Sequence, residues 1–172
     1  MLTKEIKRKF RIYEQKIIVL WNKKLRIEAL LYMSLIVELF TKEAIFSFEK
    51  IIEGSALQYN VGFNPRNLYT RADIESQPLG YLIKILDTYT RNKKLIKDLK
   101  HFSEVRNKCI HKLLDHEIKD INKELRNFNK FYYKLMVSLF KLNLNQLKLT
   151  EKSFFHVCDE CFKRDSPKHI KI

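Results

Sequence analysis

Apolar residues recur every three or four positions along most of this chain, which is the period of one face of an α-helix. The longest such series consists of Ile118, Ile121, Leu125, Phe128, Tyr132, Leu135, Leu139 and Leu142. The 172 residues include only three glycines and three prolines, where average usage would give about 20 of the two together. Because an all-β fold needs a turn roughly every ten residues, the sequence predicts an all-α protein.

The periodic segments predict four or five helices packed around one core as an antiparallel bundle. They cover residues 2–21, 25–53, 79–89, 92–114 and 117–145. The second segment is apolar almost all round from Ala29 to Phe40, as expected of a helix at the centre of a bundle or between two protomers. We expect Gly54 to end this helix, and residues 54–77, which have no clear period, to form a long loop with short ordered pieces.

The length suits a single domain. We expect the helical bundle to occupy residues 1–145 and a short basic tail to occupy residues 146–172, where the periodicity is lost. The longest apolar run, Ala29–Val37, is interrupted by Ser34 and is far shorter than the about 18 residues that cross a membrane. The N-terminus has no signal-peptide pattern, and three cysteines do not suit a disulfide framework. The sequence therefore predicts a cytoplasmic protein without a membrane partner.

The chain carries 34 Lys and Arg residues against 20 Asp and Glu residues, a net charge of +14. This excess is larger than solubility requires and favours an anionic partner, although charged residues can also simply form a solvated surface. Four lysines that we expect to bind nucleic-acid phosphates without reading the base sequence are Lys93, Lys94, Lys97 and Lys100. Tyr132 and Tyr133 could stack on bases, but their helical spacing favours the core or an interface.

One residue breaks the apolar stripe of the helix expected at 92–114. The stripe consists of Leu95, Leu99, Phe102, Cys109 and Leu113. At about 100° per residue, position 106 lies at the centre of the same face, and it holds an arginine. A guanidinium keeps its charge, so Arg106 must be paired or must open onto a polar cleft.

Two interpretations of Arg106 are open at this point. Its side chain could extend from the edge of the core and pair with Glu38 or Glu104. Glu38 lies within the apolar stretch of the second helix and needs a cation there. Alternatively, Arg106 could bind a ligand together with His111, which lies five residues further on and about 140° around the helix. Asn107 is one turn before His111 and could orient the imidazole or a ligand.

The segment Arg106-Asn107-Lys108-Cys109-Ile110-His111 resembles the Arg-x4–6-His signature of HEPN domains, in its Arg-Asn-x-x-x-His form. A helix before the motif, a long amphipathic helix after it and the upstream segment Leu79-Gly80-x-Leu82-Ile83 are also similar. The likeness in architecture covers most of residues 1–145, whereas only the six-residue motif is specific. The resemblance implies a helical bundle that forms a homodimer and places two motifs near one cleft. Many HEPN relatives are metal-independent endoribonucleases of toxin–antitoxin, phage-defence or RNA-processing systems, and others are inactive binding modules.

The residue types suit RNA cleavage by the 2′-OH without a metal or cofactor. Histidine titrates near neutral pH, so His111 is expected to act as general acid or base. Arg106 is expected to hold the phosphate and stabilise its developing charge, and Asn107 to orient the substrate or His111. Glu38 is expected to support Arg106. A second copy would supply the second histidine, because one imidazole cannot act as acid and base at once.

One position departs from the family. Some toxin relatives carry a tyrosine, modified by a nucleotidyltransferase, where this chain has Leu113. An antitoxin or a nucleotidyltransferase is therefore a weaker expectation than RNA and a second copy of the chain. The alternatives are a catalytically inactive HEPN-like module that binds RNA, a nucleotide or a partner protein, and an unrelated basic helical bundle that acts as an interaction protein or binds DNA.

The C-terminal tail contains a lone Cys-x2-Cys pair, Cys158 and Cys161. A structural zinc ion needs four ligands, for which His156 and His169 would have to complete the set. A redox pair needs a helix that follows a strand, and none is predicted here. The pattern favours two reduced cysteines and no metal.

Overall fold

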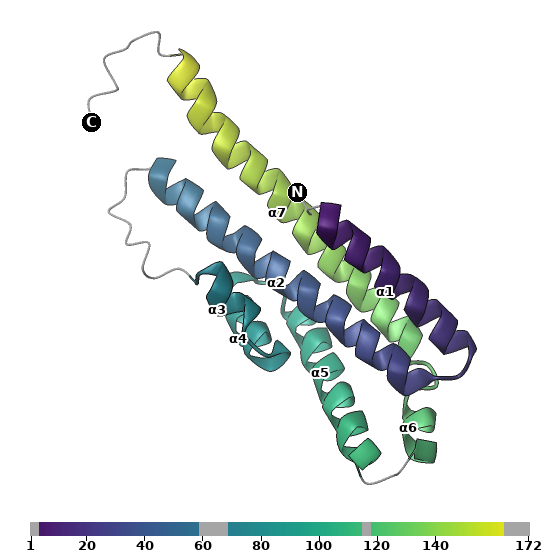
Figure 1. Ribbon diagram of the computed structural model, residues 1–172. Coiled ribbons are helices and arrows are strands. Elements are labelled where there is room, and N and C mark those ends of the chain that lie inside the picture. The colour runs from purple at the N-terminus through teal and green to yellow at the C-terminus, as the bar shows by residue number, and fades with distance from the viewer. Residues whose placement is uncertain (1–3, 59–68, 115–117, 164–172) are drawn as a thin grey trace.

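In the computed structural model, residues 4–58, 69–114 and 118–163 are described, and the secondary structure of these ranges is entirely helical (Figure 1). The helices are α1 (Lys4–Asn22), α2 (Arg26–Gln58), α3 (Arg71–Glu75), α4 (Leu79–Tyr89), α5 (Lys93–Leu114), α6 (Ile118–Glu124) and α7 (Phe128–Lys163). The all-α prediction is confirmed. The described part holds seven helices instead of four or five because two short ones, α3 and α6, were not expected. No helix in the described ranges combines the length and apolar character needed to cross a membrane.

Helix α2 is the centre of the bundle, as its apolar sequence predicts, and it contacts each of the six other helices. Figure 1 shows α1 and α7 beside α2 on one side, and α4 and α5 on the other. Helices α1 and α2 are antiparallel, since Phe10 packs edge-on against Phe40 while Lys16 donates a hydrogen bond to Tyr32. The predicted antiparallel arrangement does not extend to α2 and α7.

Helices α2 and α7 run in the same direction. The Asn143 amide nitrogen donates to the Phe40 carbonyl at 3.4 Å, and the Gln146 amide nitrogen donates to the Ala44 carbonyl at 3.0 Å, so the register advances together on both helices. This is possible because α3 to α6 carry the chain back to the end at which α2 begins (Figure 1).

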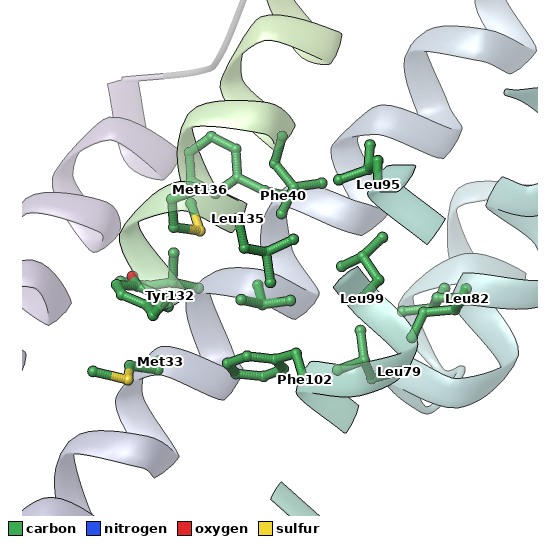
Figure 2. Close-up of a cluster of buried hydrophobic side chains, with 14 of the residues drawn as sticks. Met33, Phe40, Leu79, Leu82, Leu95, Leu99, Phe102, Tyr132, Leu135 and Met136 are labelled. Carbon is green, nitrogen blue, oxygen red and sulfur yellow. The ribbon is translucent and has the colours of Figure 1, made fainter. Parts of the chain in front are cut away.

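The core lies where α2, α4, α5 and α7 meet (Figure 2). Its side chains include Met33, Phe40, Leu79, Leu82, Leu95, Leu99, Phe102, Tyr132, Leu135 and Met136, all buried. Leu95, Leu99, Phe102 and Cys109 of the predicted α5 stripe are buried. Leu113, in the last turn of α5, is 37 % exposed.

The expected loop at residues 54–77 is partly wrong. Gly54 is buried inside α2, which continues to Gln58, so packing of the helix outweighs the weak helix propensity of glycine. The segment also contains α3, which Thr70 and Asp73 start as a capping box: the Thr70 hydroxyl accepts from the Asp73 amide, and the Asp73 carboxylate accepts from the Thr70 amide at 2.9 Å. Residues 59–68 lie outside the described part.

The helix expected at residues 117–145 is two helices. A turn at residues 125–127 separates α6 from α7, although Leu125, its first residue, and Phe128, the first residue of α7, are both buried. The apolar period therefore continues across a real break. Helix α7 then passes residue 145, where the tail was expected to begin, and continues to Lys163, with the buried amides of Asn143 and Gln146 bonded to α2.

Candidate functional site on α5

Helix α5 carries the whole motif. Arg106 follows Phe102 on the buried side of α5 and precedes Cys109, and both of these neighbours are buried. The Arg106 side chain is half-buried, as expected for a long side chain that starts in the core and extends toward water. Burial raises the pKa of the Cys109 thiol, which is thus held as a neutral core side chain.

The Arg106 guanidinium has no carboxylate partner among the described residues. Its Nη1 donates to Oδ1 of Asn107 at 3.3 Å. Its Nε is buried and has no hydrogen-bond partner among the residues that the structure describes. A buried donor without an acceptor is costly, so this site retains a fixed positive charge and an unused hydrogen-bond donor.

Glu38 does not support Arg106 as expected. Its Oε1 accepts a hydrogen bond from Nζ of Lys42 at 2.7 Å, one turn further along α2. Lys42 also donates to the main-chain carbonyl of Glu75 at 2.8 Å. Glu38 thus pairs with a cation of its own helix, Lys42, and not with Arg106 of α5. The other expected partner, Glu104, is exposed and has no ion pair in the described part of the chain.

His111 is exposed in the last turn of α5. It shares a helix face with Asn107, four residues before it. Because Arg106 Nη1 reaches Asn107, the guanidinium extends toward the face that carries His111. The structure therefore joins Arg106 to Asn107 and leaves His111 open to solvent. Within the described contacts of one copy, Arg106 and His111 do not touch.

Helix α6 fixes the end of α5 that carries the motif. Lys108 Nζ lies 2.6 Å from Oε1 of Glu124, and Lys112 Nζ lies 3.7 Å from Oε2. The hydrogen bond from Lys108 holds the pKa of the Glu124 carboxyl below its usual range and raises the pKa of Lys108. Lys108 within the motif and Lys112 just after it thus share one carboxylate, whereas Arg106 has no carboxylate partner among the described residues.

The four predicted phosphate-binding lysines divide into two pairs. Lys93 and Lys100 approach the two carboxylate oxygens of Asp87 at 2.7 Å and 3.4 Å. The hydrogen bond from Lys93 is the main reason that the pKa of Asp87 is lowered. Lys94 and Lys97 are exposed, and neither forms an ion pair with a described residue.

A cavity of about 540 Å³ lies along this lysine-rich face. Its lining includes Asp87, Lys93, Lys97, Lys100, His101 and Glu104. Sequence reasoning missed His101 and Asp87. The spacing of His101, four residues after Lys97, could have placed both on one face of the helix, but the approach of Asp87 depends on how α4 packs.

No metal site is found where side chains are described: no group of three or more His, Cys, Asp or Glu residues is placed to hold an ion. The side chains of Cys158, Cys161, His156 and His169 lie outside the described residues. Comparison with protein-family models, with curated proteins and with solved structures finds no match for this chain. The chemistry of α5 is therefore the basis for a function.

Proposed function

We propose that this protein is a metal-independent endoribonuclease of the HEPN type that acts as a homodimer. The observation that supports the proposal is the state of Arg106. It is a permanent cation on the buried side of α5, without a carboxylate among the described residues and with a buried, unused Nε. The Asn107 amide oxygen accepts a hydrogen bond from its guanidinium, and the exposed imidazole of His111 lies five residues further along α5. This is a combination that suits a bound phosphodiester.

The reaction follows from these residue types. A base removes the proton from the ribose 2′-OH, the O2′–P bond forms, and the P–O5′ bond breaks as an acid protonates the leaving 5′-oxygen. The products are a 2′,3′-cyclic phosphate and a 5′-OH. His111 performs one proton transfer, and Arg106 stabilises the charge on the phosphoryl oxygens. The second proton transfer is assigned to His111 of a second copy.

The end of α5 supports the choice of a second copy. Leu113 is 37 % exposed on the same helix face as Arg106, where the rest of the stripe is buried. A second copy that covers this end of the bundle would bury Leu113 and bring another His111 toward Arg106. The resemblance to HEPN proteins leads us to propose a toxin–antitoxin or phage-defence setting in the cytoplasm, with an antitoxin or a nucleotidyltransferase as a further partner.

The test is cleavage of end-labelled RNA in the presence of EDTA, with analysis of the product ends. Wild-type protein is expected to give 2′,3′-cyclic phosphate and 5′-OH ends. His111→Ala and Arg106→Ala are expected to remove the activity while circular dichroism remains unchanged. Arg126→Ala, at an exposed arginine between α6 and α7, is the matched control and should retain activity. Cleavage by His111→Ala at the wild-type rate would overturn the proposal.

A second candidate is an inactive HEPN-like module that binds RNA, a nucleotide or a partner protein. The observation that favours it is the absence of a described contact between Arg106 and His111 in one copy. RNA binding that is weakened by Arg106→Ala, with no product under any condition, would decide in its favour.

A further inference from the structure

The cavity on α5 has no role in the reaction proposed above, although it has the size of a ligand site. Its volume of about 540 Å³ lies within the range of about 300 to 1,000 Å³ that is typical of small-molecule pockets. Cations, carboxylates and an imidazole ring line it together. A ligand that matches this lining carries an anionic group for the lysines, hydrogen-bond donors for the carboxylates and a flat ring for the imidazole.

His101 provides the surface for a flat ring. Its imidazole is exposed and packs edge-on against Phe131 of α7, with ring centroids 5.0 Å apart and planes at 82°. The contact with Phe131 limits the rotation of the imidazole and reduces the entropy lost when a ligand stacks on it. Nucleobases in single-stranded RNA are commonly bound by stacking on His and other ring side chains.

The lysines provide the anion site. Lys97 lies one turn before His101 on the same face and has no ion pair with a described residue. Lys93 and Lys100 already hold two oxygens of one anionic group, the Asp87 carboxylate, at 2.7 Å and 3.4 Å. Phosphate oxygens can bind to the same ammonium groups.

Glu104 provides the hydrogen-bond acceptor. It lies three residues after His101, on the same face, lines the cavity and forms no ion pair with a described residue. A carboxylate accepts hydrogen bonds from the exocyclic amino group of cytosine, and adenine carries such a group as well, whereas uracil has none. The cavity is thus suited to a base that carries an amino group.

We propose that this cavity binds one nucleotide of an RNA strand, with an amino-bearing base stacked on His101 and bonded to Glu104, and with its phosphate at Lys97. The choice of an RNA strand as the ligand rests on the proposed function. Along α5, at 1.5 Å per residue, His101 lies about 15 Å from His111. The cavity therefore selects a base a few nucleotides away from the phosphate that is cleaved.

The test measures binding of labelled oligo(A), oligo(C) and oligo(U) ribonucleotides to the full chain carrying His111→Ala, by fluorescence anisotropy. Oligo(A) and oligo(C) are expected to bind more tightly than oligo(U). Adding His101→Ala should weaken oligo(A) and oligo(C) by about tenfold, and His101→Phe should restore them because the stacking surface returns. Glu104→Ala, which removes the acceptor oxygens, should reduce the preference over oligo(U), while Glu53→Ala, an exposed control on α2, should not.

Lys97→Ala should weaken all three oligonucleotides to the same extent, and by more than Lys141→Ala, its control on α7. Equal affinity for the three homopolymers, or unchanged affinity with His101→Ala and Glu104→Ala, would overturn the inference. Competition by free AMP or CMP as strong as that by the oligonucleotides would also overturn it, because the site would then take a free nucleotide. Cleavage by the wild-type protein is measured separately. If the wild-type protein cleaves RNA but the cavity variants bind the oligonucleotides as wild type does, only the inference is refuted. If binding is base-selective but no RNA is cleaved, only the proposed function is refuted.

Discussion

Lys42 Nζ lies 2.7 Å from Oε1 of Glu38, one turn away on α2, and this pair neutralises the carboxylate that was expected to support Arg106. This pairing affects Arg106 on α5, because it removes the carboxylate that could have balanced its charge. A guanidinium that starts in the core is left with one hydrogen bond to a neighbouring amide and no described counter-charge. The charge is therefore available to a phosphate.

The pairing of Glu38 with Lys42 predicts that Glu38 is dispensable for RNA cleavage. Glu38→Gln should cleave at close to the wild-type rate, whereas Arg106→Lys should lose about 100-fold, because an ammonium cannot reproduce the bidentate contact. Both rates are measured on the same labelled RNA. Equal losses in the two variants would mean that Glu38 positions Arg106 after all.

Arg106→Met should separate stability from function. Methionine completes the apolar stripe between Phe102 and Cys109, and replacing a half-buried guanidinium whose Nε has no described partner by an apolar side chain is expected to be neutral or stabilising. Urea unfolding should show an equal or higher free energy of unfolding, and the cleavage assay should show no activity. A clear loss of stability would show that Arg106 has a structural partner.

Phe102 is completely buried where α5 meets the core (Figure 2). Phe102→Ala should lower the free energy of unfolding by about 3–5 kcal/mol, since it removes the buried ring and leaves a cavity. Val137→Ala, at a side chain that is 53 % exposed on α7, is the control and should have a small effect. Urea denaturation compares the two variants, and similar values would contradict the packing described here.

The ion pair between Lys108 and Glu124 predicts a dependence of stability on acid. The pKa of Glu124 is lower in the folded state than in the unfolded chain, so its contribution is complete above the unfolded value of about 4.3 and is lost as the pH falls through the folded value. The stability difference between wild type and Glu124→Gln should be present at pH 7 and should disappear in acid. A difference that grows in acid would contradict the sign of the shift.

Glu14 on α1 should behave in the opposite way. Its burial beside Tyr132 and Tyr133 raises its pKa, so the folded state favours the protonated carboxyl. Wild-type stability should fall, relative to Glu14→Gln, as the pH rises from the unfolded value toward the raised folded value. Thermal unfolding at a series of pH values measures this difference, and a constant difference from pH 3 to pH 7 would contradict it.

The spacing of apolar residues by three and four was enough to predict α1, α2, α4 and α5, because in each of them the buried face runs along one unbroken helix. It could not show the break before α7, since the buried residues Leu125 and Phe128 continue the helical spacing across the turn at residues 125–127. Position 106 was correctly placed on the buried face of α5. The partner of Glu38 and the approach of Asp87 to the lysines of α5 depend on local pairing and on helix packing, which periodicity does not encode.

The parallel arrangement of α2 and α7 has a consequence for how this protein can change. Helices α2 and α7 begin at the same end of the bundle, so the helices α3 to α6 form one connection between them. Helix α5 is part of that connection. Helices α1, α2 and α7 contact one another through their own side chains. Substitutions on the outward side of α5 can therefore change which ligand the protein binds, while the packing of α1, α2 and α7 stays the same.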